Sequence, residues 1–235
     1  MSNVAEIVDV ERLSRSVEHS MPDTAAVLRQ IAHQLRQPLS AIEAIAYYLS
    51  LTLPPGETRA LEQLEILQRL VQDTDVILSD AVHFLGASPS HPMLADLKDL
   101  VADAISQLQP FESQPPRVEY GVGPAPVLVD SAQATHAVRN LVSYLRQLAP
   151  DGEDVELAVS ATEFEAKLAI QVATSVCTVA EVKLLLDPQH PHLGSGSGLA
   201  MASVRRIIDA HGGRIAVENQ PPGGIRLTVI FPVAR

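Results

Sequence analysis

Hydrophobic positions in the first third of the chain recur every three or four residues, which is the spacing of one face of an α-helix. The first such stretch follows Asp23 and Thr24, which are good helix-capping residues, and runs to Leu53, where a Pro-Pro-Gly sequence ends it. A second stretch with the same spacing runs from residue 57 to about 85. The first apolar stripe consists of Val27, Ile31, Leu35, Leu39, Ile42, Ala46 and Leu49. The pattern predicts a long antiparallel helical hairpin.

Two such helices cannot bury both apolar stripes against each other alone. Each helix of roughly 28 residues is about 40 Å long, at 1.5 Å per residue. Left exposed, the stripes would form an apolar patch well above a few hundred Å². We therefore expect a homodimer in which two hairpins form a four-helix bundle.

The rest of the chain has a different organisation. Residues 1–22 carry mixed charge with weak periodicity, and we interpret them as a partly ordered leader before a hairpin over 23–86. Residues 87–92 contain two prolines in a Ser-rich stretch, which is typical of a linker. A second domain is expected over 93–235.

The pattern of this second domain alternates between helix and strand periods, which predicts an α+β sandwich with a mixed or antiparallel sheet. Asp130 and Gln133 form a capping-box start for one of its helices. The expected elements are a helix over 93–108, a strand over 127–129, a helix from Asp130 to about Leu148, strands over 155–160, 167–172, 214–218 and 225–231, and a helix over 199–210.

Charge and composition exclude several classes of protein. The chain carries 17 basic and 28 acidic side chains, a formal charge of −11, so it lacks the cationic surplus that binding to nucleic acid requires. A lone cysteine, Cys177, builds neither a disulfide nor a thiolate metal cluster. Neither a signal peptide nor an apolar stretch of membrane-spanning length is evident. We expect a cytoplasmic protein with no membrane and no nucleic-acid partner.

The first candidate for chemistry is His33. It lies about 240° around the first helix from Val27, away from the apolar stripe, at about 100° per residue. Pro38 removes a backbone hydrogen bond to the carbonyl near Gln34 and bends the helix beside the imidazole. An exposed imidazole beside a bend suits a nucleophile that large partners approach. The alternative is an ordinary surface histidine.

Two further signals lie in the second domain. Gly194, Gly196 and Gly198 lead directly into a helix, where backbone N–H groups converge on an anion, although a flexible connector has the same composition. That helix closes on His211-Gly-Gly as a C-cap and passes into a strand. Asn140, on the helix before the sheet, is either a polar site residue or a surface amide.

Three segments, in this order, resemble the transmitter module of sensor histidine kinases. AHQLRQPLSAI (32–42) resembles the family's H-box, VRNLVSYL (138–145) its N-box, and GSGSGLAMASVRRIIDAHGGRI (194–215) its second glycine box. The resemblance covers about residues 24–235. It implies a dimerisation and histidine-phosphotransfer hairpin, with His33 as phosphoacceptor, followed by a Bergerat-type ATP-binding α/β sandwich. Its partner would be the receiver domain of a response regulator.

The chain departs from the family pattern at several functional positions. The acidic residue that follows the family's histidine is replaced by Gln34, which cannot take a proton. The second asparagine of the N-box, which helps to hold Mg²⁺ and phosphate, corresponds to Tyr144, and a basic residue of that box corresponds to Gln147. Asn140 alone remains of this set.

The first glycine box is also altered. The family's aspartate, which accepts a hydrogen bond from the adenine amino group, corresponds to Ala173, and its two glycines to Ser175 and Cys177. The segment that corresponds to the ATP lid is short. The residues that remain for a weak or vestigial nucleotide site are Asn140, Gly194, Gly196 and Gly198.

These observations leave three hypotheses for function. The first is a histidine phosphotransferase, or degenerate histidine kinase, that exchanges phosphate between His33 and a response-regulator aspartate and needs no cofactor. The second is an active autokinase that uses Mg-ATP. The third is a non-catalytic module that binds a response regulator.

The candidate residues around His33 carry alternatives of their own. The predicted catalytic set is His33, Gln34, Arg36, Gln37 and Pro38. Gln37 lies one turn after His33, where it could position water for dephosphorylation of a partner or simply face solvent. Arg36 is either a phosphate contact or a solvated surface residue. We assign no metal to His190 and His192, because two histidines without nearby acids or thiols are a weak signal.

Overall fold

The computed structural model describes residues 24–54, 56–86, 90–108, 116–150, 155–187, 196–221 and 223–234. The chain divides into two compact units, Met1–Ala87 and Ser88–Arg235. The leader expected over residues 1–22 and part of the expected linker, residues 87–89, lie outside the described residues.

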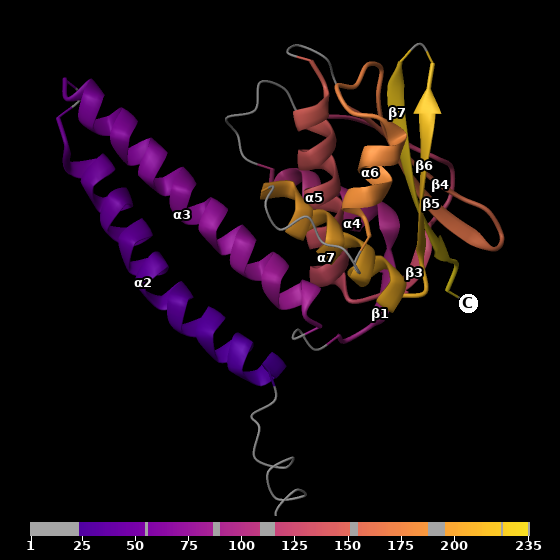
Figure 1. Ribbon diagram of the computed structural model, residues 1–235, viewed down its shortest axis with the longest axis horizontal. Helices are drawn as coiled ribbons and strands as arrows, with labels where there is room; N and C mark the ends of the chain where they lie inside the picture. The colour runs from indigo at the N-terminus through magenta and orange to yellow at the C-terminus, as the bar shows by residue number, and fades with distance from the viewer. Residues whose placement is uncertain are drawn as a thin grey trace, which may run out of the picture. The chain divides into compact units, whose positions relative to one another are not determined.

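The first unit is a helical hairpin. Helix α2 (Thr24–Thr52) and helix α3 (Thr58–Phe84) run antiparallel along each other (Figure 1). Pro38 lies inside α2. The buried side chains of the hairpin are Ala32, Ala46, Val71 and Asp80. The predicted hairpin is confirmed, with ends within one or two residues of those expected.

The second unit contains a five-stranded sheet and a separate two-stranded ribbon. In the larger sheet, β2 pairs parallel with β4, and the other neighbouring strands are antiparallel. The ribbon joins β1 (Met93–Asp96) and β3 (Pro126–Val129). The order of the larger sheet is β2 (Arg117–Tyr120), β4 (Glu156–Ala161), β5 (Glu165–Val172), β7 (Gly224–Pro232), β6 (Arg214–Gln220).

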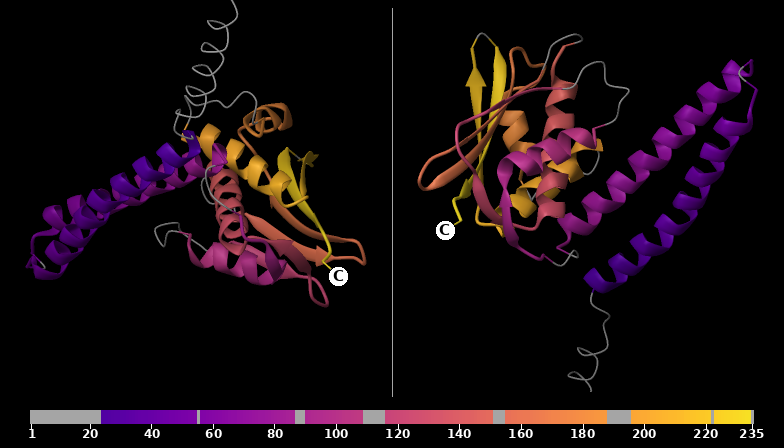
Figure 2. Two further views of the ribbon diagram at one scale, coloured as in Figure 1. Left: turned by 90° about the horizontal axis from the view of Figure 1, so that it is seen from below. Right: turned by 180° about the vertical axis from the view of Figure 1, so that it is seen from behind.

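The helices of this unit lie on one face of the sheet (Figures 1 and 2). They are α4 (Leu97–Ser106), α5 (Ser131–Leu148), α6 (Val179–Leu185) and α7 (Gly196–Ala210). Helix α5 packs against α4, α7 and β5. Alternate residues of β5, from Ala166 to Val172, are buried in the core, as strand geometry requires.

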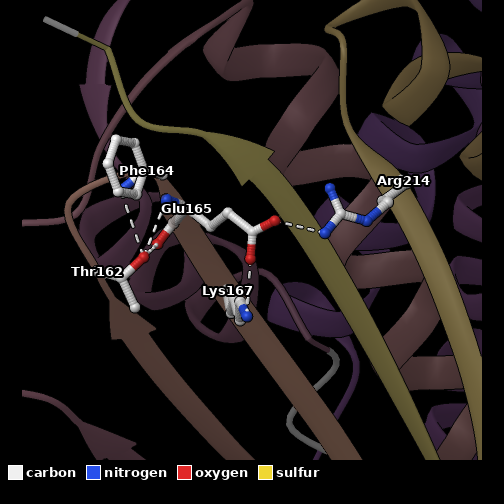
Figure 3. A network of polar contacts seen from close by, with 5 residues as sticks. All are labelled: Thr162, Phe164, Glu165, Lys167 and Arg214. Atoms are coloured by element: carbon white, nitrogen blue, oxygen red, sulfur yellow. Dashed lines mark hydrogen bonds and ion pairs between the residues drawn. The ribbon is translucent and has the colours of Figure 1, made fainter.

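The other face of the sheet carries polar side chains (Figure 3). Glu165 accepts from Lys167 at 2.8 Å and also pairs with Arg214. Lys167 and Arg214 both lie opposite Ile230 in the strand register, so Arg214 reaches across β7 to Glu165. Hydrogen bonds from the two cations lower the pKa of Glu165. Nearby, Arg226 donates to Gln171, which donates to Glu156 at 2.7 Å. These polar pairs therefore mark the solvent-facing side of the sheet.

The fold class predicted from the sequence, an antiparallel hairpin followed by an α/β sandwich with a mixed sheet, is confirmed. Asp130 caps α5 as expected, because its side chain accepts from the backbone N–H of Gln133 at 3.1 Å. The dimeric bundle stays a prediction.

One predicted helix is wrong at its start. Residues 93–96, expected to begin a helix over 93–108, form strand β1, and the helix begins at Leu97. Asp96 caps this helix by accepting from the N–H of Lys98 at 2.9 Å. A short apolar run fits either a strand or a helix, and here the pairing of β1 with β3 decides.

Besides β1, two further elements were not predicted. Strand β2 lies in the Pro-rich connection, and its pairing with β4, far along the chain, has no local signal. Helix α6 lies in the stretch interpreted as the short lid. Its start was readable, because Thr178 and Glu181 form a complete capping box.

Candidate functional site

His33 lies exposed on α2, as its helical position predicts. Gln34, Gln37 and Pro38 are exposed beside it. The Nε2 atom of Gln37 lies 3.5 Å from Nε2 of His33. The imidazole is thus open to a partner, and an amide lies within reach of its Nε2 atom.

Arg36 makes contacts across the hairpin, while its side chain stays 40% exposed. Its Nε donates to Oδ1 of Asp75 on α3 at 2.6 Å, and a terminal nitrogen donates to Oγ of Ser79 at 2.8 Å. The guanidinium therefore joins the two helices, and its role as a phosphate contact stays a prediction. Sequence reasoning missed Asp75 and Ser79, because contacts across a hairpin require the register of its helices.

The face of α2 that carries His33 continues toward the hairpin turn. Ser40 and Ala44 follow on this face at helical spacing and are exposed. Beyond them, Tyr47, Tyr48 and Leu51 are 59%, 65% and 66% exposed. Two small residues thus lie between the imidazole and a group of large exposed side chains.

Another face of α2 carries exposed aliphatic side chains, which are Val27, Ile31, Leu35, Ile42, Ile45 and Leu49. On α3, Ile66, Leu70 and Ile77 share one face and are exposed as well. A single hairpin therefore leaves much of its apolar surface in water, which is unfavourable in proportion to the exposed area.

In the second unit, α5 presents a buried polar stripe. His136, Asn140 and Tyr144 follow one another at intervals of four residues and are all buried. Arg139 NH2 and Asn140 Nδ2 approach the two ring nitrogens of His136 at 2.9 and 3.2 Å. The side chain of Asn140 is thus positioned by a contact with His136 on the same helix.

Tyr144 has the most unusual environment of this stripe. It is 6% exposed, and its hydroxyl is the buried side-chain polar atom without a hydrogen-bond partner among the residues that the structure describes. Burial, with smaller contributions from Cys177 and Glu181, raises the pKa of Tyr144 to about 12. The phenol therefore stays protonated at neutral pH.

Polar groups of the loop after β5 form hydrogen bonds within the loop and with the end of α5. Ser175 Oγ accepts from the N–H of Cys177 at 3.2 Å and donates to its carbonyl at 3.1 Å. The N–H of Val176 donates to the carbonyl of Leu148, at the end of α5, at 3.2 Å. Ala173, at the position of the family's adenine-binding aspartate, is exposed and offers no side-chain acceptor.

The glycine-rich segment is described only in part. Gly194, His190 and His192 lie outside the described residues, whereas α7 begins at Gly196 and Gly198 is buried. No group of three or more His, Cys, Asp or Glu side chains in the described ranges could hold a metal ion.

Comparison with known proteins places these features in a family context. Residues 129–235 match the family described as Histidine kinase-, DNA gyrase B-, and HSP90-like ATPase. The adaptive-response sensory kinase SasA of Prochlorococcus marinus is 25% identical over 95% of this chain, and the sensor histidine kinase ZraS of Escherichia coli is 26% identical over 86%. The chain resembles a sensor histidine kinase transmitter module. It spans 60% of the first of these relatives and 44% of the second.

Solved structures show the same fold for this transmitter-like chain. Full-length ShkA, in complex with AMPPNP, has a TM-score of 0.65 at 20% identity, covering 90% of this chain and 47% of that one. The histidine kinase AdeS of Acinetobacter baumannii has a TM-score of 0.53 at 19% identity, covering 86% and 98%. Within the described residues, no helix is both long and apolar enough to cross a lipid bilayer.

Two described side chains of this module, Tyr144 and Ala173, do not fit the Mg-ATP site that the resemblance implies. Mg²⁺ prefers amide or carboxylate oxygens, but the position of the second N-box asparagine holds the protonated phenol of Tyr144. Ala173 cannot accept a hydrogen bond from an adenine amino group.

Proposed function

We propose that this chain is a two-component phosphorelay protein that carries a phosphoryl group on His33. It exchanges this group with the aspartate of a response-regulator receiver domain and does not use ATP. The observation that carries the proposal is the exposed imidazole of His33, which lies on an open helix face while the residues of the nucleotide-like site do not suit Mg-ATP.

The transfer needs little from this chain. The Nε2 lone pair of His33 attacks the phosphorus of the receiver's aspartyl phosphate, the P–O bond to the carboxylate breaks, and a P–N bond forms. The carboxylate leaves as the free anion, and the imidazole proton stays on Nδ1 or passes to water. The amide nitrogen of Gln37, 3.5 Å from Nε2, favours the tautomer in which Nε2 carries the lone pair, and this amide moves aside when that lone pair attacks phosphorus. Because the nucleophile is a neutral ring, Gln34 need not act as a base.

The surface beside His33 supports docking of a protein partner. Ser40 and Ala44 leave room for a partner element to approach the imidazole, and Tyr47, Tyr48 and Leu51 offer aromatic and aliphatic contact area. A receiver helix laid along this face would bring its domain's phosphorylated aspartate to His33.

The aliphatic faces of α2 and α3 support a homodimer. Ile42 on α2 and Ile77 on α3 are 40% and 54% exposed in one hairpin, and a second hairpin would bury both faces as a four-helix bundle. The proposed organisation is a hairpin over 23–86, a linker over 87–92 and an ATPase-like domain over 93–235. We also propose a cytoplasmic location without membrane or nucleic-acid contacts, given the charge of −11.

The decisive experiment transfers label to the chain from receiver domains phosphorylated with a small-molecule donor. Label should appear on the wild-type chain, disappear in His33→Ala and persist in the matched hairpin variant His83→Ala. Label that survives His33→Ala would refute the proposed acceptor. A His33→Ala protein that still binds the receiver and keeps its biological effect would instead support a binding module.

An active autokinase is the second candidate. Helix α7 begins at Gly196 with Gly198 buried, which retains a helix N-terminus of the kind that binds phosphate, and the relatives named above are kinases. Calorimetric titration with Mg-ATP distinguishes the autokinase from the ATP-independent phosphotransferase. Binding at about tens of micromolar or tighter, followed by labelling of His33 from ATP, would favour the autokinase.

A further inference from the structure

A buried histidine outside the proposed phosphotransfer site holds the start of the second unit. His211 follows α7 and is 8% exposed. Its Nδ1 lies 2.7 Å from the carbonyl oxygen of Ile207, which can only accept, so Nδ1 carries the ring proton. Nε2 then presents a lone pair, and the backbone N–H of Asp130 donates to it at 3.0 Å.

The same two residues hold the segment that precedes β1. Ser90 Oγ lies 3.2 Å from Nε2 of His211, and the N–H of His91 donates to Oδ2 of Asp130 at 2.9 Å. The other carboxylate oxygen of Asp130 caps α5 through Gln133. Residues 90 and 91 are therefore fixed at two points, one at the start of α5 and one at the end of α7.

The imidazole is not required to end α7. Gly212 has a φ of 68°, which ends the helix through its backbone, and a side chain on Gly213 would lie 2.8 Å from the ring of Phe231. Because the glycines already make the turn and its close packing, the contacts of His211 to Ser90 and Asp130 are a separate feature of the structure.

We propose that Ser90, His91, Asp130 and His211 form a latch that holds residues 90–92 against the second unit, ahead of β1. With the latch closed, the chain is fixed to the second unit from Ser90 onward. With it open, residues 90–92 are released up to β1, a segment that spans about 10 Å when extended, at roughly 3.3–3.6 Å per residue.

Amide hydrogen exchange of the full-length chain, followed by NMR, tests the latch. His211→Ala should accelerate exchange at the amides of Asp130 and His91 by about fivefold to tenfold, the effect of losing one hydrogen bond. Amides inside α5 should be unaffected. The matched control is Arg205→Ala, which removes an exposed ion pair with Asp209 on the same helix and should leave both amides unchanged.

A second variant keeps the test decisive if His211→Ala unfolds. Ser90→Ala removes only the contact from the segment before β1 and should speed both the exchange of the His91 amide and cleavage within residues 90–92 by proteinase K. Unchanged exchange and cleavage in a folded variant would overturn the latch. The outcome is independent of phosphotransfer, because neither readout involves His33.

Discussion

The guanidinium of Arg36 on α2 donates from Nε to Oδ1 of Asp75 on α3 at 2.6 Å, two residues before Pro38. Pro38 has no N–H, so the carbonyl of Gln34 loses its usual intrahelical donor at the turn that carries His33. The ion pair therefore supports the hairpin where its first helix is weakest.

Replacing Arg36 should loosen the hairpin modestly. The side chains of Arg36 and Asp75 are 40% and 50% exposed, so we expect Arg36→Ala to lower the free energy of unfolding by about 0.5–1 kcal/mol. Urea unfolding with Asp75→Asn and the double variant measures the coupling. Gln30→Ala, at an exposed position of the same helix, is the control. Additive effects of Arg36→Ala and Asp75→Asn would contradict a stabilising ion pair between these residues.

Pro38→Ala should separate stability from function. Alanine restores an intrahelical hydrogen bond, so helix stability should rise by about 1–3 kcal/mol. If the bend exposes His33 to its partner, transfer from a phosphorylated receiver should slow in the same variant. Thermal unfolding and transfer rates measure the two effects. An unchanged transfer rate would show that the bend expected at Pro38 does not contribute to transfer.

The hydroxyl of Tyr144 should be dispensable for stability. Tyr144→Phe removes a buried group without a partner, so we expect it to raise the free energy of unfolding by about 1 kcal/mol or leave it unchanged. A loss of more than about 1 kcal/mol would mean that the hydroxyl has a partner in solution.

The ionisation of Tyr144 at alkaline pH tests the burial of its side chain independently. In the unfolded chain Tyr144 ionises near pH 10, whereas in the folded protein its pKa is about 12. The stabilisation linked to this shift is therefore fully present below pH 10 and is lost between about pH 10 and 12. Ultraviolet difference absorbance of the wild type against Tyr144→Phe follows the ionisation, and a transition near pH 10 would contradict the burial.

Asp130 should make the second unit sensitive to acid. Burial opposes ionisation of its carboxyl, but hydrogen bonds from the backbone N–H groups of His91 and Gln133 outweigh it and lower its pKa. Its contribution is therefore present above the ordinary carboxyl pKa and is lost as pH falls through the folded value. Thermal unfolding between pH 7 and 3 should show a smaller decline for Asp130→Asn than for the wild type.

Charge on the aliphatic faces should prevent dimerisation. Ile42→Glu and Ile77→Glu place carboxylates where a second hairpin is proposed to pack, and burying an unpaired charge is costly. Analytical ultracentrifugation at micromolar concentration should show a dimer for the wild type and a monomer for the double variant. A wild-type monomer would exclude the four-helix bundle.

The elements that the sequence predicted are ones with local signals, although α6 was missed despite its capping box. The helices of the hairpin follow from apolar spacing and the Pro-Pro-Gly stop, and α5 follows from its cap at Asp130. In contrast, β1 and β2 exist because β3 and β4 pair with them, and pairing partners distant in sequence leave no local trace.

The candidate site divides in the same way. The exposure of His33 follows from its angular position on a helix. The partners of Arg36 and the unpaired hydroxyl of Tyr144 depend on how separate elements pack, so the sequence could name these residues but could not assign their contacts.

Strand β7 has a consequence for how the protein is made. It follows every other described strand in sequence, yet it lies between β5 and β6. During synthesis β5 and β6 therefore emerge from the ribosome before the strand that joins them, and the sheet cannot close until residue 232 is available. The hairpin needs only neighbouring residues and is free to form first. The nascent chain would thus carry a folded hairpin before the sheet of the second unit is complete.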